Sequence, residues 1–415
     1  MRHFLRVLAW VIFAALLFPS FAVAQAAPEM PEFGKPGEVI HYASVALTHP
    51  KKSTDRTDGG TGHVFFTLWI PEGLKTVRGI YHTPFNLETV EKEQSRAMAR
   101  QWGFAIVGGN FMRVHKDDFA PSLLAGVRAL AAQSGHAELN HAPFIFTSMS
   151  AGVGMCVTLA EQLPERTLAC GLVCLEVAPE TERTRDVPMM SIFGEKDGGQ
   201  MAAHIERLPK TRAALGSSWA IVPQWGRRHE WALANNLLWP FFEEVIRQRY
   251  PADASPADGP VKLRRYDPAR VWLGDPADWT TIAPLDKYPG DKAAACWLPG
   301  EDVARVWQSF AVRKPLVRIT APEPQGDKKP LAVFAPGAEV LVQVQCDATF
   351  PAQRITLFDR AARLVESEVR DGKCELRAAN LTPGFHALIA QATHADGRSE
   401  LSRPVTILVQ TSASK

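Results

Sequence analysis

Short, wholly apolar runs alternate with helical patterns between residues 39 and 250. A run such as Phe104–Val107 has no polar position, which is typical of a strand buried on both faces of a parallel sheet. The predicted strands are Val39–Leu47, Val64–Ile70, Val77–Tyr81, Phe104–Val107, Phe144–Phe146, Leu172–Leu175, Met189–Phe193 and Trp219–Val222. The predicted helices are Glu88–Gln101, Pro121–Gln133, Ala151–Gln162, Gln200–Leu215 and Glu230–Arg249. This order predicts an α/β fold, a mostly parallel sheet flanked by helices, with the first two strands as an antiparallel hairpin at its edge.

The pattern changes after residue 250. Residues 251–315 hold nine prolines and four tryptophans, with a helix predicted at Glu301–Phe310. Four tryptophans carry too much apolar area for a free linker, so we expect an extension packed on the α/β domain. From about Leu316, apolar and polar positions alternate in short runs separated by turns, which predicts an all-β sandwich over residues 316–415.

The first 24 residues have the pattern of an export signal. Arg2 and Arg6 precede the apolar run Val7–Phe18, and Ala22–Ala24 provides small residues for cleavage. An uncleaved anchor helix is the alternative, but about 12 residues span only about 18 Å of a bilayer core about 30 Å thick. We therefore expect cleavage after Ala24, a first domain over residues 25–250, and a secreted or periplasmic protein without a further membrane span.

Composition narrows the possible partners. The chain has 46 Lys+Arg and 44 Asp+Glu, and removal of Arg2 and Arg6 with the signal makes the two counts equal. Such a balance excludes nucleic acid and anionic membrane surfaces as main partners.

Six cysteines are present, and export permits disulfides. We predict a Cys346–Cys374 disulfide between neighbouring strands of the sandwich. A bond from Cys156 to Cys170 or Cys174 is an open alternative. No cysteine spacing resembles a zinc site.

The segment Pro143–Gly154 contains the strongest chemical signal. An apolar strand passes directly into a helix, and Ser150 stands at the turn with Ser148 and Gly152 two residues to either side. A sharp strand-to-helix turn exposes a serine hydroxyl above the sheet and requires small neighbours at these two positions. Ser150 is therefore the candidate nucleophile, and Ser148 satisfies the rule less well.

An acid and a histidine follow in the order that would activate this serine. Asp197 lies in a turn after the strand Met189–Phe193, and His229 lies in a loop after Trp219–Val222. The carboxyl ends of parallel strands meet at one sheet edge, where catalytic groups gather. We predict a Ser150–His229–Asp197 triad, with Glu195 as the competing acid.

Together these segments resemble the α/β-hydrolase fold over about residues 39–250. The resemblance implies an oxyanion hole that includes the backbone N–H of Ala151. Relatives usually place a His-Gly pair after the third strand, whereas this chain has Tyr81-His82-Thr83-Pro84-Phe85. Proline has no N–H, so the second donor is assigned to Phe85. His82 is expected to be a structural histidine.

The surroundings of the predicted triad suggest an open site. The short connection after Leu175 leaves no room for the helical cap of many relatives, which favours bulky or polymer-linked esters. Trp225 and Trp231 beside His229 are candidates for a substrate rim, with ordinary packing as the alternative. The group His115, Asp117 and Asp118 is expected to be a solvated loop rather than a metal site.

The C-terminal region resembles bacterial immunoglobulin-like modules. It contains no Trp or Tyr, which favours a spacer or stabilising role over sugar binding.

The sequence thus predicts a cofactor-free serine esterase similar in kind to feruloyl esterases, acetyl-xylan esterases and polyester depolymerases. Its expected partner is an ester substrate, possibly linked to a polysaccharide or another polymer. A serine peptidase of the same fold and a non-catalytic surface-binding protein are the alternatives.

Overall fold

The computed structural model describes residues 33–35, 38–48, 62–112, 114–175, 177, 181–326 and 330–411. The predicted signal, residues 1–24, lies outside the described residues. No helix in these ranges is long and apolar enough to cross a membrane.

An eight-stranded sheet forms the centre of the α/β domain, in the order β1-β2-β4-β3-β5-β6-β7-β8. Its strands are β1 (His41–Ala46), β2 (His63–Trp69), β3 (Gly79–Thr83), β4 (Phe104–Gly109), β5 (Phe144–Met149), β6 (Thr167–Val173), β7 (Met189–Gly194) and β8 (Trp219–Gln224). β2 pairs antiparallel with both β1 and β4, and the pairs from β4 to β8 are parallel. This arrangement confirms the mostly parallel α/β fold and its antiparallel edge hairpin.

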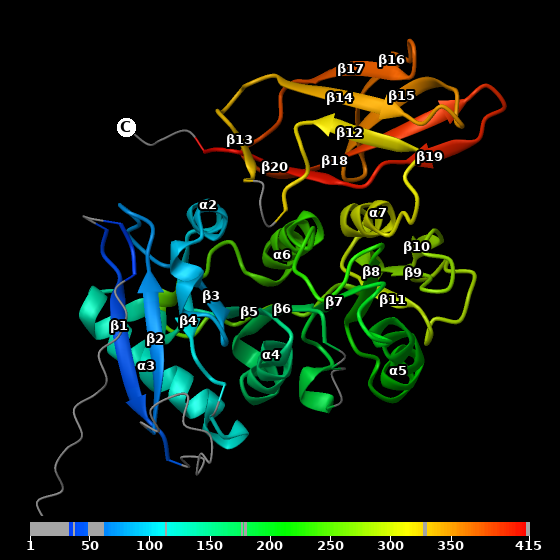
Figure 1. Ribbon diagram of the computed structural model, residues 1–415. Helices are drawn as coiled ribbons and strands as arrows, with labels where there is room; N and C mark the ends of the chain where they lie inside the picture. Colours follow the sequence, from blue (N-terminus) through cyan, green and yellow to red (C-terminus); the bar gives the residue numbers. More distant parts are fainter. Residues whose placement is uncertain are drawn as a thin grey trace, which may run out of the picture.

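Helices cover both faces of this sheet, as Figure 1 shows. α2 (Glu93–Trp102) and α6 (Asn235–Arg249) lie on one face, and α3 (Phe119–Ser134), α4 (Ala151–Gln162) and α5 (Gln200–Leu215) on the other. β4, β6, β7 and β8 are buried at every position, and β5 at every position but Met149, which explains their largely apolar sequences.

The extension covers the free edge of the sheet at β8. It contains a small sheet, β10 (Ile282–Pro284), β9 (Trp272–Gly274) and β11 (Cys296–Leu298), followed by α7 (Glu301–Phe310). The indole N–H of Trp307 donates to the Ile221 carbonyl over 2.9 Å, and the Ile221 N–H lies 3.5 Å from Cys296 Sγ. Side chains of the extension thus bind backbone groups of the edge strand β8, which could otherwise pair with a strand of another chain.

The C-terminal residues form two packed sheets, as predicted. One is β12 (Val317–Ala321), β14 (Val340–Cys346) and β17 (Lys373–Ala378). The other contains β13 (Ala332–Phe334), β20 (Val405–Val409), β18 (Gly384–His394), β15 (Ala352–Asp359) and β16 (Ala362–Glu368), with β19 (Ser399–Leu401) beside β18. β14 alternates strictly between buried and exposed positions, the period of two seen in the sequence.

The predicted Cys346–Cys374 disulfide is wrong, because all six cysteines are free. β14 and β17 are neighbours, but Cys374 pairs with Val344, and Cys346 N–H donates to the Gly372 carbonyl. Cys346 is therefore a diagonal neighbour of Cys374, and diagonal neighbours lie farther apart than the roughly 4 Å between Cβ atoms that a disulfide needs. The alternative bonds from Cys156 are also absent.

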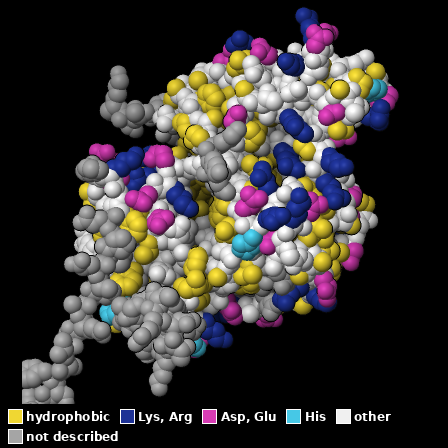
Figure 2. Space-filling model, in the orientation of Figure 1, with side chains coloured by type: hydrophobic (Ala, Val, Ile, Leu, Met, Phe, Trp, Pro, Cys, Tyr) yellow, Lys and Arg dark blue, Asp and Glu magenta, His cyan; other side chains and the backbone are white. Residues whose placement is uncertain are grey.

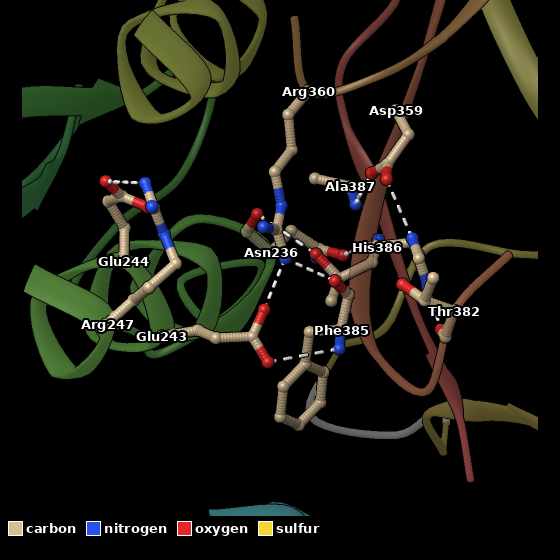
Figure 3. A network of polar contacts seen from close by, with 11 residues as sticks. Asn236, Glu243, Glu244, Arg247, Asp359, Arg360, Thr382, Phe385, His386 and Ala387 are labelled. Atoms are coloured by element: carbon tan, nitrogen blue, oxygen red, sulfur yellow. Dashed lines mark hydrogen bonds and ion pairs between the residues drawn. The ribbon is translucent and has the colours of Figure 1, made fainter. Parts of the chain in front are cut away.

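β18 joins the sandwich to the α/β domain. Its Leu388 faces the core of the sandwich, whereas Phe385 belongs to the core of the α/β domain. The Phe385 ring lies 5.1 Å from that of Trp239 on α6. Around it, Glu243 of α6 forms an ion pair with Arg360 and accepts a hydrogen bond from the Phe385 N–H, as Figure 3 shows. The sandwich is thus packed onto α6 by both apolar and charged contacts.

Candidate active site

Ser150 stands at a strained turn between β5 and α4. Its backbone has φ 56° and ψ −132°, a conformation that costs a non-glycine residue free energy. A Cβ at Gly152 would lie 2.0 Å from Ser148 Oγ and 3.0 Å from Phe85 Cβ. A side chain at Gly152 would therefore collide with Ser148, which agrees with the small residue predicted at this position.

Asp197 and His229 form a hydrogen-bonded pair beyond the ends of β7 and β8. His229 Nδ1 lies 3.0 Å and 3.1 Å from the two carboxylate oxygens of Asp197. Asp197 is 13% exposed and His229 is 44% exposed. A proton on Nδ1, donated to Asp197, leaves Nε2 of His229 free to accept a proton from the solvent side.

The turn of Asp197 and the loop of His229 are joined by backbone hydrogen bonds. Glu195 N–H donates to the Gln224 carbonyl over 3.1 Å, and Lys196 N–H donates to the Arg227 carbonyl over 2.8 Å. A Cβ at Gly194 would lie only 2.2 Å from the Arg228 carbonyl oxygen. Gly194 therefore allows the close approach that brings His229 to Asp197.

Glu195, the competing acid, has a different role. Its carboxylate accepts the Gly226 N–H over 2.9 Å and forms an ion pair of 2.8 Å with Arg313. The hydrogen bond from Gly226 and the charge of Arg313 lower the pKa of Glu195. Its carboxylate stabilises the loop that carries His229, and Asp197 is the acid in contact with the imidazole.

Two further residues support the site, and neither was recognised in the sequence. The Gln224 side chain accepts the Leu233 N–H over 2.9 Å and donates to the Glu230 carbonyl over 3.4 Å, so it holds both sides of the His229 loop. Cys174 follows β6 with φ 58°, and its thiol donates to the same Glu230 carbonyl over 3.3 Å. No sequence motif marks either residue, since their roles depend on how the loop crosses the sheet edge.

Cys174 also links the serine to the acid–histidine pair. Ser150 N–H donates to the Val173 carbonyl over 2.9 Å, next to Cys174. Donor atoms of Cys174, Asp197 and His229 all lie within 4.8 Å of one another. These residue types can bind zinc. Burial raises the pKa of the Cys174 thiol to about 11, so near neutral pH this thiol is protonated.

The serine and histidine are on the same sheet edge without a direct bond. Among the described residues, no hydrogen bond joins the Ser150 hydroxyl to the His229 imidazole. Catalytic hydrogen bonds are often long in the absence of substrate and shorten when it binds.

The two residues predicted as oxyanion donors belong to segments that contact each other at the start of α4. Ala151 is the first residue of α4, where a backbone N–H has no partner within the helix. Phe85 follows β3, and its Cβ approaches Gly152 in the first turn of α4. The segment after β3 is therefore packed against the first turn of α4, which begins directly after Ser150.

The two predicted rim tryptophans have partners within the chain. The Trp225 indole N–H donates to the Ala311 carbonyl over 2.6 Å, and the Arg313 guanidinium lies 4.8 Å from the ring centre. The indole N–H of Trp231 donates to the Asn235 side chain over 3.0 Å. Trp225 is thus directed toward the extension, and Trp231 toward the start of α6.

The other histidines singled out in the sequence have partners outside the pair. His82 is fully buried and its Nδ1 lies 2.9 Å from the Val107 carbonyl. Burial lowers the pKa of His82 to about 4, which suits the predicted structural role. His115 Nδ1 accepts the Asp117 N–H over 3.4 Å within its own loop.

Comparison with known proteins gives likenesses in structure alone. No family model matches the chain, and no curated protein matches it. An S-formylglutathione hydrolase from Agrobacterium tumefaciens is similar to 48% of this chain over 91% of its own, at 14% identity and a TM-score of 0.34. A dienelactone hydrolase from Anabaena variabilis is similar to 46% over 88% of its own, at 16% identity and a TM-score of 0.31.

The C-terminal part has a likeness of its own. Fibronectin(III)-like modules of CbhA from Clostridium thermocellum are similar to 23% of this chain over 94% of theirs, at 17% identity and a TM-score of 0.20. Identities and TM-scores this low carry no argument about function.

Proposed function

We propose that this protein is an exported serine hydrolase that cleaves carboxylic esters. The observation that carries the proposal is the strained turn of Ser150, on the same sheet edge as the hydrogen-bonded His229–Asp197 pair. Export rests on the first 24 residues of the sequence.

In the proposed reaction, Ser150 Oγ attacks the ester carbonyl carbon while Nε2 of His229 takes the hydroxyl proton. Asp197 holds the Nδ1 proton and stabilises the imidazolium that forms. The backbone N–H groups of Ala151 and Phe85 stabilise the negative oxygen of the tetrahedral intermediate. Its collapse expels the alcohol, which takes the proton from His229 and leaves an acyl group on Ser150.

Water then completes the cycle. His229 removes a proton from a water molecule, which attacks the acyl carbonyl. The second tetrahedral intermediate releases the carboxylic acid and returns the proton to Ser150. The reaction is balanced without a cofactor.

The form of the site supports large ester substrates. The described residues between β6 and β7 contain one short 3₁₀ helix, Glu182–Thr184, and no helical cap. Since His229 is also well exposed, the ester of a bulky or polymer-linked substrate can approach from solvent.

Hydrolysis of p-nitrophenyl acetate tests the proposal. We expect Ser150→Ala to lower kcat/KM about 10³-fold or more, while thermal unfolding stays close to that of the unchanged protein. Ser148→Ala is the matched control, and it should retain activity within a few-fold. Full activity in Ser150→Ala, or its loss in Ser148→Ala alone, would refute the assignment. Aryl-ester, acetylated-sugar, polyester and peptide substrates, compared at equal concentration, would then define the preference.

A further inference from the structure

Lys and Arg side chains gather where the β-sandwich meets the α/β domain and its extension (Figure 2). A cavity of about 580 Å³ lies at this junction. Both sides contribute to its lining, which includes Leu233 of the His229 loop, Arg313 and Lys314 at the end of the extension, and Arg318 and Arg403 of the sandwich. We call this cavity the junction cleft.

Positive charge in the junction cleft exceeds negative charge. Four basic residues line it, and the single acid among its lining residues is Asp347. The Asp347 carboxylate accepts hydrogen bonds of 2.9 Å and 2.7 Å from the N–H and hydroxyl of Thr349, within its own turn. Of the four cations, Arg313 has a carboxylate partner, Glu195, outside the lining. The hydrogen bonds from Thr349 and then the charge of Arg318 lower the pKa of Asp347, so Arg318 is partly compensated within the cleft.

Arg403 is the most constrained of these cations. Its guanidinium donates to the carbonyls of Val312 and Arg313 over 3.1 Å and 3.2 Å, and no carboxylate among the described residues forms an ion pair with it. Burial and then the charges of Arg227 and Arg318 lower the pKa of Arg403. Like charges held together in this way repel one another, and a bound anion would relieve that repulsion.

The junction cleft lies close to the proposed active site along the chain. Leu233, which lines the junction cleft, follows His229 by four residues. Arg227, whose charge acts on Arg403, precedes His229 by two residues. Arg313 and Lys314 also line a second cavity, of about 930 Å³, together with Trp225 and Arg360. Each cavity is of a size that holds a small-molecule ligand, so a ligand that occupies both would be elongated.

We propose that the junction cleft binds an acidic polysaccharide, through carboxylate or sulfate groups spaced along its chain. Lys and Arg side chains make strong charge-assisted hydrogen bonds to anionic groups, and cations from both the extension and the sandwich line the cleft, so more than one such group of an extended ligand can be held. The near-neutral balance of the whole chain disfavours the denser charge of nucleic acid. As a way of bringing a polymer-linked ester to Ser150, this inference rests on the proposed function.

Binding of polygalacturonate, which carries carboxylates, tests the proposal in the full-length Ser150→Ala protein. Dextran sulfate and uncharged dextran are the comparison polymers. We expect polygalacturonate or dextran sulfate to bind, with an affinity that falls as salt increases, and dextran not to bind. The stronger of the two charged polymers identifies the anionic group.

The double substitution Lys314→Gln/Arg318→Gln should weaken this binding about tenfold or more. The control, Lys210→Gln/Arg363→Gln, removes the same charge from exposed positions on α5 and β16, and should change it less than twofold. Equal binding by both variants, equal binding of dextran, or no binding of either charged polymer would overturn the proposal.

These measurements are independent of catalysis. Esterase activity without polymer binding would refute the proposal that the junction cleft binds a polysaccharide, and it would leave the proposed function unaffected. Polymer binding by a protein inactive on all esters would overturn the function and leave the cleft as a binding site.

Discussion

Substitution of Gly194 by alanine tests whether the crossing of two loops creates the active site. Gly194 has no positive φ, so alanine is compatible with its backbone conformation. The added Cβ would lie 2.2 Å from the Arg228 carbonyl oxygen and 2.7 Å from that of Arg227. An ordinary contact requires more than about 3 Å, so the loop must move by about 1 Å.

This movement acts directly on the His229–Asp197 pair. His229 follows Arg228, and its hydrogen bond of 3.0 Å to Asp197 has little room for displacement. A misplacement of about 1 Å can cost about 100-fold in rate, which corresponds to about 2.7 kcal/mol. We therefore expect Gly194→Ala to lower kcat/KM on p-nitrophenyl acetate about 100-fold.

Gly154→Ala is the matched control. Gly154 lies in α4, and an added Cβ there would meet no atom within 4 Å. This variant should keep its activity and gain up to about 1 kcal/mol of stability, since alanine favours a helix. Activity of a folded Gly194→Ala within threefold of the unchanged protein would refute the reasoning, provided that His229→Ala is inactive.

Three further predictions concern stability and redox state. Burial lowers the pKa of His386, but its hydrogen bond and ion pair with Asp359 outweigh burial and raise the pKa overall. This contact therefore stabilises the folded protein fully below about pH 6.5, and the stabilisation is lost as the pH rises through the raised pKa. The melting temperature should fall over that range, and a His386→Gln variant that showed the same fall would exclude this pair as its cause. Glu243→Gln should cost about 2 to 3 kcal/mol in urea unfolding, because it leaves Arg360, which is 17% exposed, without its partner, and an unchanged midpoint would contradict this. Without reductant, the unfolded chain should react with six equivalents of a thiol reagent, and fewer would indicate a disulfide.

The sequence predicts the layers of the fold well, because strands buried on both faces have few polar positions. The predicted ends of helices and strands are wrong where side-chain contacts determine where an element begins or ends. The last helix of the α/β domain begins at Asn235 rather than Glu230, since Gln224 holds residues 230–233 as a loop. β6 ends at Val173, and Cys174 then adopts φ 58°, so the predicted strand Leu172–Leu175 is displaced toward the C-terminus.

For the site, the order of residue types indicated Ser150, Asp197 and His229, and the structure brings the last two into contact. The sequence does not indicate the register in which neighbouring strands pair, or which segments distant along the chain contact each other. The spacing of residues along the chain does not show that Cys374 pairs with Val344 across two strands. It also does not show that Gly194 lies against the Arg228 carbonyl, or that the Glu195 carboxylate accepts a hydrogen bond from Gly226. These facts depend on how segments distant in the chain meet, and single-sequence patterns do not contain them.

The two-sided burial of β18 has a consequence for how the chain is divided. Accessory modules on flexible tethers can be exchanged or removed without harm to the enzyme that carries them. Removal of residues 316–415 would instead expose Trp239 and Trp102, which contact Phe385. The α/β domain would then have an exposed apolar surface, which favours aggregation. The α/β domain therefore shares part of its core with the sandwich, and we expect a chain cut at residue 315 to be less stable than the whole protein.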